Sequence, residues 1–227
     1  MISIAIDGPA GAGKSSIAKL AAKELSFIYV DTGALYRAIG WYALSCGKDP
    51  ADAGQVVPLL KEISVELKFV EGEQHVFLNG RDVSTEIRLP EVSMAASRVS
   101  AIPEVRDFLF SLQRELAEKN NVLMDGRDIG TVVLPNAQIK IFLTASAENR
   151  ADRRMKQLAE AGNHVDYNTL LAEIKERDYN DSHRAIAPLK QAEDAKLVDT
   201  TGLTLEESVK LVLDYIADRM KELKESR

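Results

Sequence analysis

The feature that most constrains this chain is a glycine-rich loop near its N-terminus. Residues 8–15 read Gly-Pro-Ala-Gly-Ala-Gly-Lys-Ser, the pattern G-x-x-x-x-G-K-[ST], between an apolar segment and a helix-forming one. Glycines let the backbone turn its N–H groups inward around phosphate oxygens, and a helix that begins near Lys14 adds its positive N-terminal end. A chance glycine-rich turn is the alternative, but the strand-loop-helix context disfavours it. The pattern therefore predicts a phosphate-binding loop in an α/β fold.

Two side chains of this loop have expected contacts. Lys14 should reach the β- and γ-phosphates of a nucleotide. The hydroxyl of Ser15 should coordinate Mg²⁺. The loop thus predicts a magnesium-bound nucleotide as ligand.

Composition and charge exclude several classes of protein. With 227 residues, the chain is long enough for one large domain or one core with insertions. A net charge of −6 argues against a surface that coats nucleic acid. The single cysteine, Cys46, cannot form an intramolecular disulfide, which fits a reducing compartment. No apolar run approaches the roughly 18 residues of a membrane span, so we expect a cytoplasmic protein without a signal peptide.

The order of the apolar segments predicts a central parallel five-stranded sheet flanked by helices. The expected strands are residues 2–6, 26–30, 121–124, 139–143 and 196–198. The expected helices include residues 14–25, a segment ending near residue 46, and residues 56–63, 90–100, 103–120, 167–179 and 204–224. In the helix at 103–120, the apolar residues that should face the core are Val105, Phe108, Leu109, Leu112 and Leu116.

A hairpin interrupts this alternation of strands and helices. Residues 65–69 alternate between apolar and polar, and a turn from Glu71 to Gln74 leads into a second strand at residues 76–78. We interpret the hairpin as an insertion outside the central sheet.

Polar residues follow the second strand, where open parallel sheets bind ligands. Thr32, Tyr36 and Arg37 are therefore candidate substrate contacts. The alternative is that Asp31 and Thr32 cap the next helix.

The third strand ends in Asp125-Gly-Arg-Asp-Ile-Gly-Thr131. An apolar strand that ends in Asp is the expected magnesium-side partner of a phosphate loop. Gly126 and Gly130 permit a tight turn, which should direct Arg127 and Asp128 into the same cleft.

Arginines concentrate between the last two strands. Arg150, Arg153 and Arg154 share a helix that Gly162 ends, and Arg177 follows on the next helix. One reading is that they are surface residues paired with glutamates on these helices. Their position around a glycine-containing loop suggests instead a mobile lid that brings guanidinium groups over a transferring phosphoryl group.

These features favour one reaction class. Phosphoryl transfer needs positioning and positive charge more than an acid–base pair. The chain lacks an N-K-x-D motif, which disfavours a GTPase, and it has no Ser–His or Cys–His pair at a telling spacing. A kinase of a small substrate is the interpretation that remains.

Over nearly its whole length, the chain resembles the bacterial cytidylate kinases, which belong to the nucleoside monophosphate kinases. The motifs that carry this resemblance are I-D-G-P-A-G-A-G-K-S-S from Ile6, D-T-G-A-L-Y-R from Asp31, D-V-S-T-E-I-R from Asp82, A-A-S-R-V-S from Ala95, M-D-G-R-D-I-G-T-V-V from Met124 and A-E-I-K-E-R-D from Ala172. The phosphate loop alone identifies only a superfamily. The D-G-R-D segment with a hairpin insertion is more specific, because the related adenylate kinases have a helical insertion and lack D-G-R-D.

The resemblance implies phosphorylation of CMP and dCMP to CDP and dCDP, with ATP and Mg²⁺ as the donor. It implies a P-loop core at residues 1–40 and 90–227, a lid at about 150–168, and an insertion at 41–89 that closes over the nucleoside monophosphate. It also implies a monomer that binds small molecules, without a nucleic-acid or membrane partner. The implied ATP-binding residues are Gly8, Pro9, Ala10, Gly11, Ala12, Gly13, Lys14, Ser15 and Ser16.

The resemblance also implies contacts with the acceptor and with the transferred group. Ser97, Arg106 and Asp128 resemble cytosine- or ribose-side contacts, Arg37 and Arg127 resemble arginines that hold the acceptor phosphate, and Asp181 and Arg184 resemble a pentose-side pair. Thr32 stands where relatives often have serine, and Tyr36 lies in the same motif. The implied catalytic residues are Lys14, Arg127, Arg153, Arg154, Arg177 and Arg184.

Two other hypotheses remain. The chain could be a P-loop kinase of another small acceptor, such as UMP, a sugar acid or a coenzyme precursor. It could also be a binding module in which ATP closes the lid without phosphoryl transfer, although a sensor has no use for so many arginines.

Overall fold

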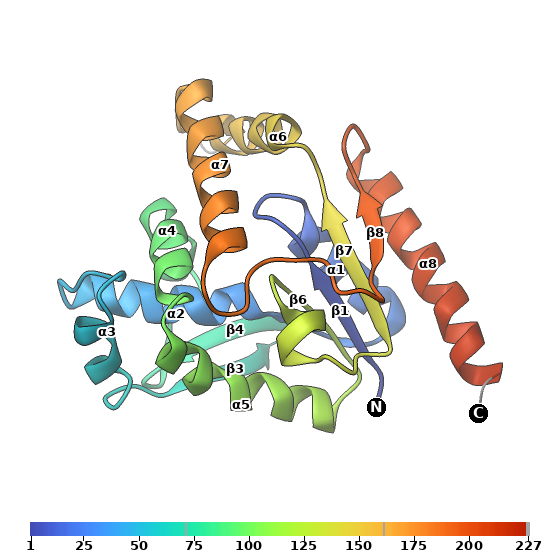
Figure 1. The fold of residues 1–227 in the computed structure, drawn as a ribbon, viewed down its shortest axis with the longest axis horizontal. Helices are drawn as coiled ribbons and strands as arrows, with labels where there is room; N and C mark the ends of the chain where they lie inside the picture. Colours follow the sequence, from blue (N-terminus) through green and yellow to red (C-terminus); the bar gives the residue numbers. More distant parts are fainter. Residues whose placement is uncertain (71, 161, 226–227) are drawn as a thin grey trace. The chain divides into compact units, whose positions relative to one another are not determined.

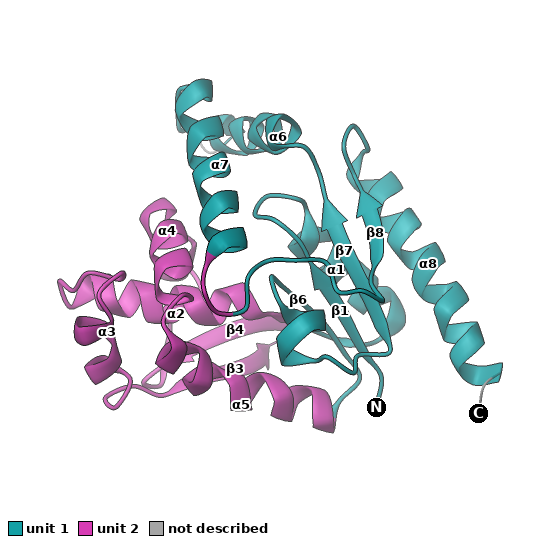
Figure 2. Cartoon of the chain, in the orientation of Figure 1, with its two compact units in different colours: residues 1–29, 120–183, 187–227 teal, residues 30–119, 184–186 magenta. Residues whose placement is uncertain are grey.

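The computed structural model describes residues 1–70, 72–160 and 162–225, and it divides into two compact units (Figures 1 and 2). Unit 1 comprises residues 1–29, 120–183 and 187–227, and unit 2 comprises residues 30–119 and 184–186. Two positions of the predicted segments, Glu71 in the hairpin turn and Ala161 in the lid, lie outside the described residues. No described helix is long and apolar enough to cross a membrane.

The central sheet has five strands in the order β2-β6-β1-β7-β8. The strands are β1 (Ser3–Asp7), β2 (Ile28–Asp31), β6 (Val122–Gly126), β7 (Ile139–Thr144) and β8 (Lys196–Asp199). β1 lies between β6 and β7 and pairs in parallel with both, while β7 pairs in parallel with β8. All five residues of β6 are buried, as expected for a strand with both faces covered. The prediction of a central five-stranded parallel sheet is confirmed.

Two helices of unit 1, α1 (Lys14–Leu25) and α8 (Leu205–Glu225), pack on this sheet (Figure 1). Helices α6 (Ala147–Glu160) and α7 (Tyr167–His183) pack against each other beyond the end of β7, and a short π-helix, η2 (Ile129–Val133), follows β6. Helix α7 continues four residues past its predicted end at residue 179. Its polar last turn is stabilised because Asp181 is buried and paired with Arg127.

Unit 2 contains the predicted hairpin, as β3 (Val65–Val70) and β4 (Glu73–Leu78), and a short third strand that the sequence did not indicate, β5 (Arg81–Asp82). Its helices are α2 (Thr32–Ser45), α3 (Ala53–Leu59), η1 (Glu86–Arg88), α4 (Pro90–Val99) and α5 (Pro103–Lys119). The predicted bounds of α3, residues 56–63, were wrong. The helix begins earlier because the side chain of Asp52 caps it, accepting a bond from the Gly54 N–H at 2.8 Å.

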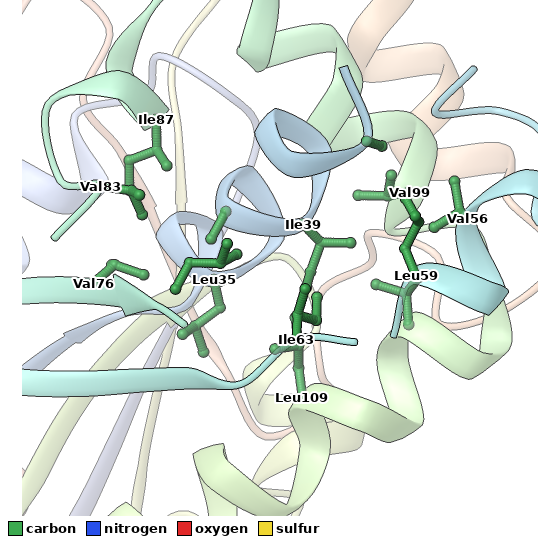
Figure 3. Packing of buried hydrophobic residues seen from close by; sticks show 14 of the residues in the cluster. Leu35, Ile39, Val56, Leu59, Ile63, Val76, Val83, Ile87, Val99 and Leu109 are labelled. Carbon is green, nitrogen blue, oxygen red and sulfur yellow. The ribbon is translucent and has the colours of Figure 1, made fainter. Parts of the chain in front are cut away.

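Unit 2 has a hydrophobic core of its own, which Figure 3 shows at close range. Leu35 and Ile39 of α2 lie among apolar side chains from α3, β4 and α5. The predicted stripe on α5 is confirmed for four of its five residues: Val105 and Leu109 are fully buried, and Phe108 and Leu112 pack against the same cluster, whereas Leu116 is half-buried outside it. This core gives the segments around the predicted acceptor residues a rigid support.

Candidate active site

The phosphate loop joins β1 to α1 and requires glycine at defined positions. Gly8 has a φ of +151°, and a Cβ atom there would lie 1.9 Å from the carbonyl oxygen of Leu143 in β7. Gly13 has a φ of +90° and directly precedes α1. Within the described chain, no side chain caps the start of α1, so its first N–H groups are available to an anion.

Lys14 is buried at the first position of α1. Its Nζ donates to the carbonyl oxygen of Pro9 at 2.7 Å, so the side chain folds back over the loop. Burial and the positive charge of Arg127 hold the pKa of Lys14 well below its usual value. Arg177 acts in the same direction. A phosphate group bound here would favour the charged lysine, because it would supply the missing negative charge.

Ser15 and Asp125 bring two oxygen ligands together. Ser15 Oγ donates to Asp125 Oδ2 at 2.8 Å, and the hydroxyl of Tyr29 donates to Asp125 Oδ1 at 3.1 Å. Mg²⁺ favours oxygen ligands and commonly takes one or two from the protein, with phosphate and water completing its shell. The pair fits that chemistry, whereas no cluster of three or more metal-binding side chains occurs at residues 1–70, 72–160 and 162–225.

Arg127 and Asp181, both predicted site residues, form an ion pair. Arg127 Nε donates to Asp181 Oδ2 at 2.8 Å, and the Asp181 side chain is only 4% exposed. Burial disfavours the charged guanidinium, but the charge and hydrogen bond of Asp181, together with the charges of Asp125 and Asp178, raise the pKa of Arg127 above its usual value. Arg127 therefore keeps its charge. Asp128, the next residue, is also buried.

Arg150 makes contacts that the sequence did not reveal. Its buried guanidinium donates to the carbonyl oxygen of Ala10 at 2.8 Å and to that of Ala145 at 3.0 Å. It also forms a two-bond ion pair with Asp178 of α7. Arg150 thus ties the phosphate loop to α7. Its place in an arginine-rich helix was visible in the sequence, but its partner was not.

Arg153, a predicted lid arginine, contacts backbone atoms beyond β8. Its NH2 donates to the carbonyl oxygens of Thr200 at 2.7 Å and Leu203 at 3.3 Å. Glu148, one of the surface glutamates considered as a partner for the lid arginines, pairs instead with Lys175 at 3.0 Å. Arg153 is therefore held by Thr200 and Leu203 of unit 1, mainly through their backbone carbonyl oxygens.

The two remaining lid arginines differ in exposure. Arg154 is exposed on α6, and Arg177 is half-buried on α7. Arg177 acts electrostatically on Lys14, so the structure brings it within range of the phosphate loop. A catalytic role for Arg154 or Arg177 stays a prediction.

In unit 2, Asp31 organises the start of α2. Its Oδ1 accepts a bond from the Ala34 N–H at 3.0 Å, which confirms the helix-cap interpretation of Asp31. Its Oδ2 accepts a bond from Arg88 at 3.0 Å and lies 3.5 Å from Arg37 NH1. Thr32, the first residue of α2, is buried. One carboxylate between two arginines leaves a net positive charge, which suits an anionic ligand.

Ser100 connects several predicted acceptor residues of unit 2. Its Oγ donates to the carbonyl oxygen of Ser97 at 2.8 Å and accepts a bond from Arg184 NH1 at 3.0 Å. Its carbonyl oxygen accepts a bond from Arg106 NH1 at 3.4 Å, and the Arg106 guanidinium lies 5.8 Å from the centre of the Tyr36 ring. The sequence analysis gave Ser100 no role, although it is the last residue of the A-A-S-R-V-S motif that begins at Ala95.

The loop, the Ser15–Asp125 pair and the parallel sheet define a nucleotide-binding protein of the P-loop kinase class. Solved structures agree on the fold. A gluconokinase from Sinorhizobium meliloti 1021 matches with a TM-score of 0.51 and 15% identity, over 99% of this chain and 97% of that one. An uncharacterized protein from Eubacterium ventriosum ATCC 27560 matches with a TM-score of 0.54 and 15% identity, over 96% and 99%.

Sequence comparison defines the family more narrowly. The family model for cytidylate kinase matches residues 4–218. The cytidylate kinase of Caldicellulosiruptor bescii is 55% identical over 94% of both chains. That of Carboxydothermus hydrogenoformans is 51% identical over 94% of this chain and 96% of its own, and that of Lactobacillus johnsonii is 47% identical over 97% and 96%. The chain belongs to the cytidylate kinase family, which confirms the resemblance seen in its motifs.

Proposed function

We propose that this protein transfers the γ-phosphoryl group of ATP to CMP and dCMP, giving CDP and dCDP. The observation that carries the proposal is the match of residues 4–218 to the cytidylate kinase family. The phosphate loop, with its buried Lys14, supports phosphoryl transfer as the reaction. An acid–base pair is not required, because the transition state is loose and its charge is stabilised by cations.

The donor is proposed to bind at the loop from Gly8 to Ser16. The N–H groups at the start of α1 would hold phosphate oxygens, and Lys14 would neutralise the β- and γ-phosphates. Ser15 would hold Mg²⁺ directly, with Asp125 as the neighbouring carboxylate. When bound, the metal ion neutralises phosphate charge. Arg150 keeps the backbone of the loop in place through Ala10.

The acceptor is proposed to contact residues of the two motifs that follow β2 and β6. Arg37 and Arg127 would hold its phosphate, with Thr32 and Tyr36 beside Arg37 in the chain. Asp181 and Arg184 would contact the pentose. The bonds of Arg127 to Asp181 and of Arg184 to Ser100 support these roles, because they fix each guanidinium before a ligand arrives.

Cytosine specificity is assigned to Ser97, Arg106 and Asp128. The carboxylate of Asp128 only accepts hydrogen bonds, so it suits the amino group of cytosine, directly or through the other two. Uracil has a carbonyl oxygen at that position, and an acceptor would then face an acceptor. The site should therefore favour CMP over UMP.

Arg153, Arg154 and Arg177 would stabilise charge on the transferring group, with residues 150–168 as the lid. Residues 41–89 would form the acceptor-binding insertion. The working form would be a cytoplasmic monomer that needs no nucleic acid.

The proposal is tested with Asp128→Ala in a coupled assay with ATP, Mg²⁺ and CMP. We expect kcat/KM for CMP to fall by at least ~10²-fold while ATP binding survives. Asp214→Ala, which alters an exposed carboxylate on α8, serves as the control and should behave as the wild type. An unchanged kcat/KM in Asp128→Ala would contradict the acceptor assignment.

A further inference from the structure

Asp7 is a buried carboxylate to which the proposed reaction assigns no task. It is the last residue of β1 and directly precedes Gly8 of the phosphate loop. Its side chain makes two short hydrogen bonds: Oδ1 accepts from the Ile129 N–H and Oδ2 from the Gly130 N–H, both at 2.7 Å. These are the first two amides of η2, the π-helix that follows Asp128. A single side chain thus holds the segment that directly follows the D-G-R-D motif.

The two bonds close the turn between β6 and η2. Asp7 and Gly126 are partners in the parallel ladder of β1 and β6, so the start of the turn is held by the sheet. The Asp7 carboxylate holds the other end, at Ile129 and Gly130. The residues between these anchors are Arg127 and Asp128, which are proposed to hold the acceptor. The turn therefore has one fixed position relative to the phosphate loop.

Gly130 provides the space for this contact. A Cβ atom at residue 130 would lie 3.3 Å from Asp7 Oδ2 and 3.2 Å from Cδ of Lys140. Both distances are tighter than an ordinary carbon contact, so a side chain would press on the carboxylate. The second glycine of the D-G-R-D-I-G segment is thus explained by its close approach to Asp7.

Burying the ionised carboxylate of Asp7 is unfavourable in free energy, which argues that its two hydrogen bonds have a function. Burial raises the pKa of Asp7 to about 6, and Asp128 acts in the same direction. The two amides and Lys14 act against the rise. Lys140 of β7, whose side chain passes close to Gly130, has its ammonium group bound to Asp194 at 2.9 Å. An ionised carboxylate accepts a hydrogen bond at each of its two oxygens. An amide or a protonated acid would instead place a donor opposite one of the two N–H groups.

We propose that Asp7 is a positioning residue, which holds the amides of Ile129 and Gly130 and thereby fixes Arg127 and Asp128 relative to the phosphate loop. This inference rests on the function proposed above for Arg127 and Asp128. It does not require Asp7 to touch either nucleotide.

The test compares Asp7→Asn with Glu207→Gln. Glu207 is a matched control, because its carboxylate also accepts a bond from a backbone N–H, that of Thr204 at 2.8 Å, at the exposed start of α8. In Asp7→Asn we expect kcat with CMP to fall at least ~10-fold, while the dissociation constant for ATP changes less than ~3-fold. The amides of Ile129 and Gly130 should exchange their hydrogens at least ~10-fold faster than in the wild type. Glu207→Gln should change none of these.

Either of two results would overturn the proposal. The first is a wild-type kcat in Asp7→Asn, which would show a purely structural role even if thermal stability were lower. The second is wild-type protection of the two amides. If Asp7→Asn does not fold, Gly130→Ala takes its place in the test, because it keeps the charge of Asp7 but crowds the carboxylate. A wild-type kcat in Gly130→Ala would then contradict the proposal. If the wild type makes no CDP, the proposed function fails, while the exchange of the two amides still tests the contact itself.

Discussion

Replacing Gly8 by alanine probes the phosphate loop at its tightest point. The new Cβ atom would lie 1.9 Å from the Leu143 carbonyl oxygen, so the loop or β7 must shift. Overpacking of this kind costs about 1–3 kcal/mol. The φ of +151° adds about 1–2 kcal/mol of backbone strain for any residue with a Cβ atom. Together they predict a loss of about 2–5 kcal/mol, a large part of the about 5–15 kcal/mol that stabilises a typical domain.

Gly47→Ala is the control that separates strain from collision. Gly47 follows the end of α2 with a φ of +67°, and nothing lies within 4 Å of its added Cβ atom. Its substitution should cost only the strain, about 1 kcal/mol, and leave ATP affinity unchanged. Urea unfolding gives the stability of each variant, and calorimetric titration gives the dissociation constant for ATP, which should rise at least ~10-fold in Gly8→Ala. Equal stability and equal ATP affinity in the two variants would show that the space at Gly8 does not limit the phosphate loop.

Three further predictions concern charged groups. Lys14→Ala should lose most of kcat at saturating ATP and CMP, because phosphate charge is no longer neutralised; a steady-state assay with normal turnover would show that the loop is not the donor site. Arg127→Met should destabilise the protein by about 3 kcal/mol, because it removes the ion-pair partner of the buried Asp181 carboxylate, and urea unfolding of Arg127→Met combined with Asp181→Asn should show a smaller loss. The pKa of Asp7 is raised to about 6 in the folded protein, from 3.8, so the folded state holds this proton longer. The protonated Asp7 therefore stabilises the fold fully below about pH 4, and this stabilisation is lost as pH rises through about 6. Across that window the free energy of unfolding of the wild type should fall by about 3 kcal/mol relative to that of Asp7→Asn. Equal pH profiles of the two proteins in urea unfolding would contradict the raised pKa.

The sequence predicted the sheet and the phosphate loop because both depend on local patterns. Strands such as β6 are buried on both faces, so they appear as continuous apolar runs. The loop requires glycine where a Cβ atom cannot fit, and the Gly8 contact shows why. The stripe on α5 was likewise visible, because helical periodicity records which face is buried.

The sequence could not predict which side chains meet across the fold. Asp7 and Ile129 are 122 residues apart, and Arg150 and Ala10 are 140 apart. Such contacts depend on how strands align in the sheet, which no local pattern encodes. Arg150 is the clearest case: its helix was recognised as arginine-rich, but its bond to the Ala10 carbonyl oxygen is a property of the fold.

One assay shows directly which nucleoside monophosphate this protein phosphorylates. Purified protein is incubated with ATP and Mg²⁺ and with each nucleoside monophosphate in turn, and the diphosphate products are resolved by chromatography. We expect CDP and dCDP with little UDP. Transfer to another acceptor in place of CMP would contradict the roles given to Ser97, Arg106 and Asp128. Tight ATP binding with no transfer to any acceptor would contradict the kinase proposal itself and favour a nucleotide-dependent binding module.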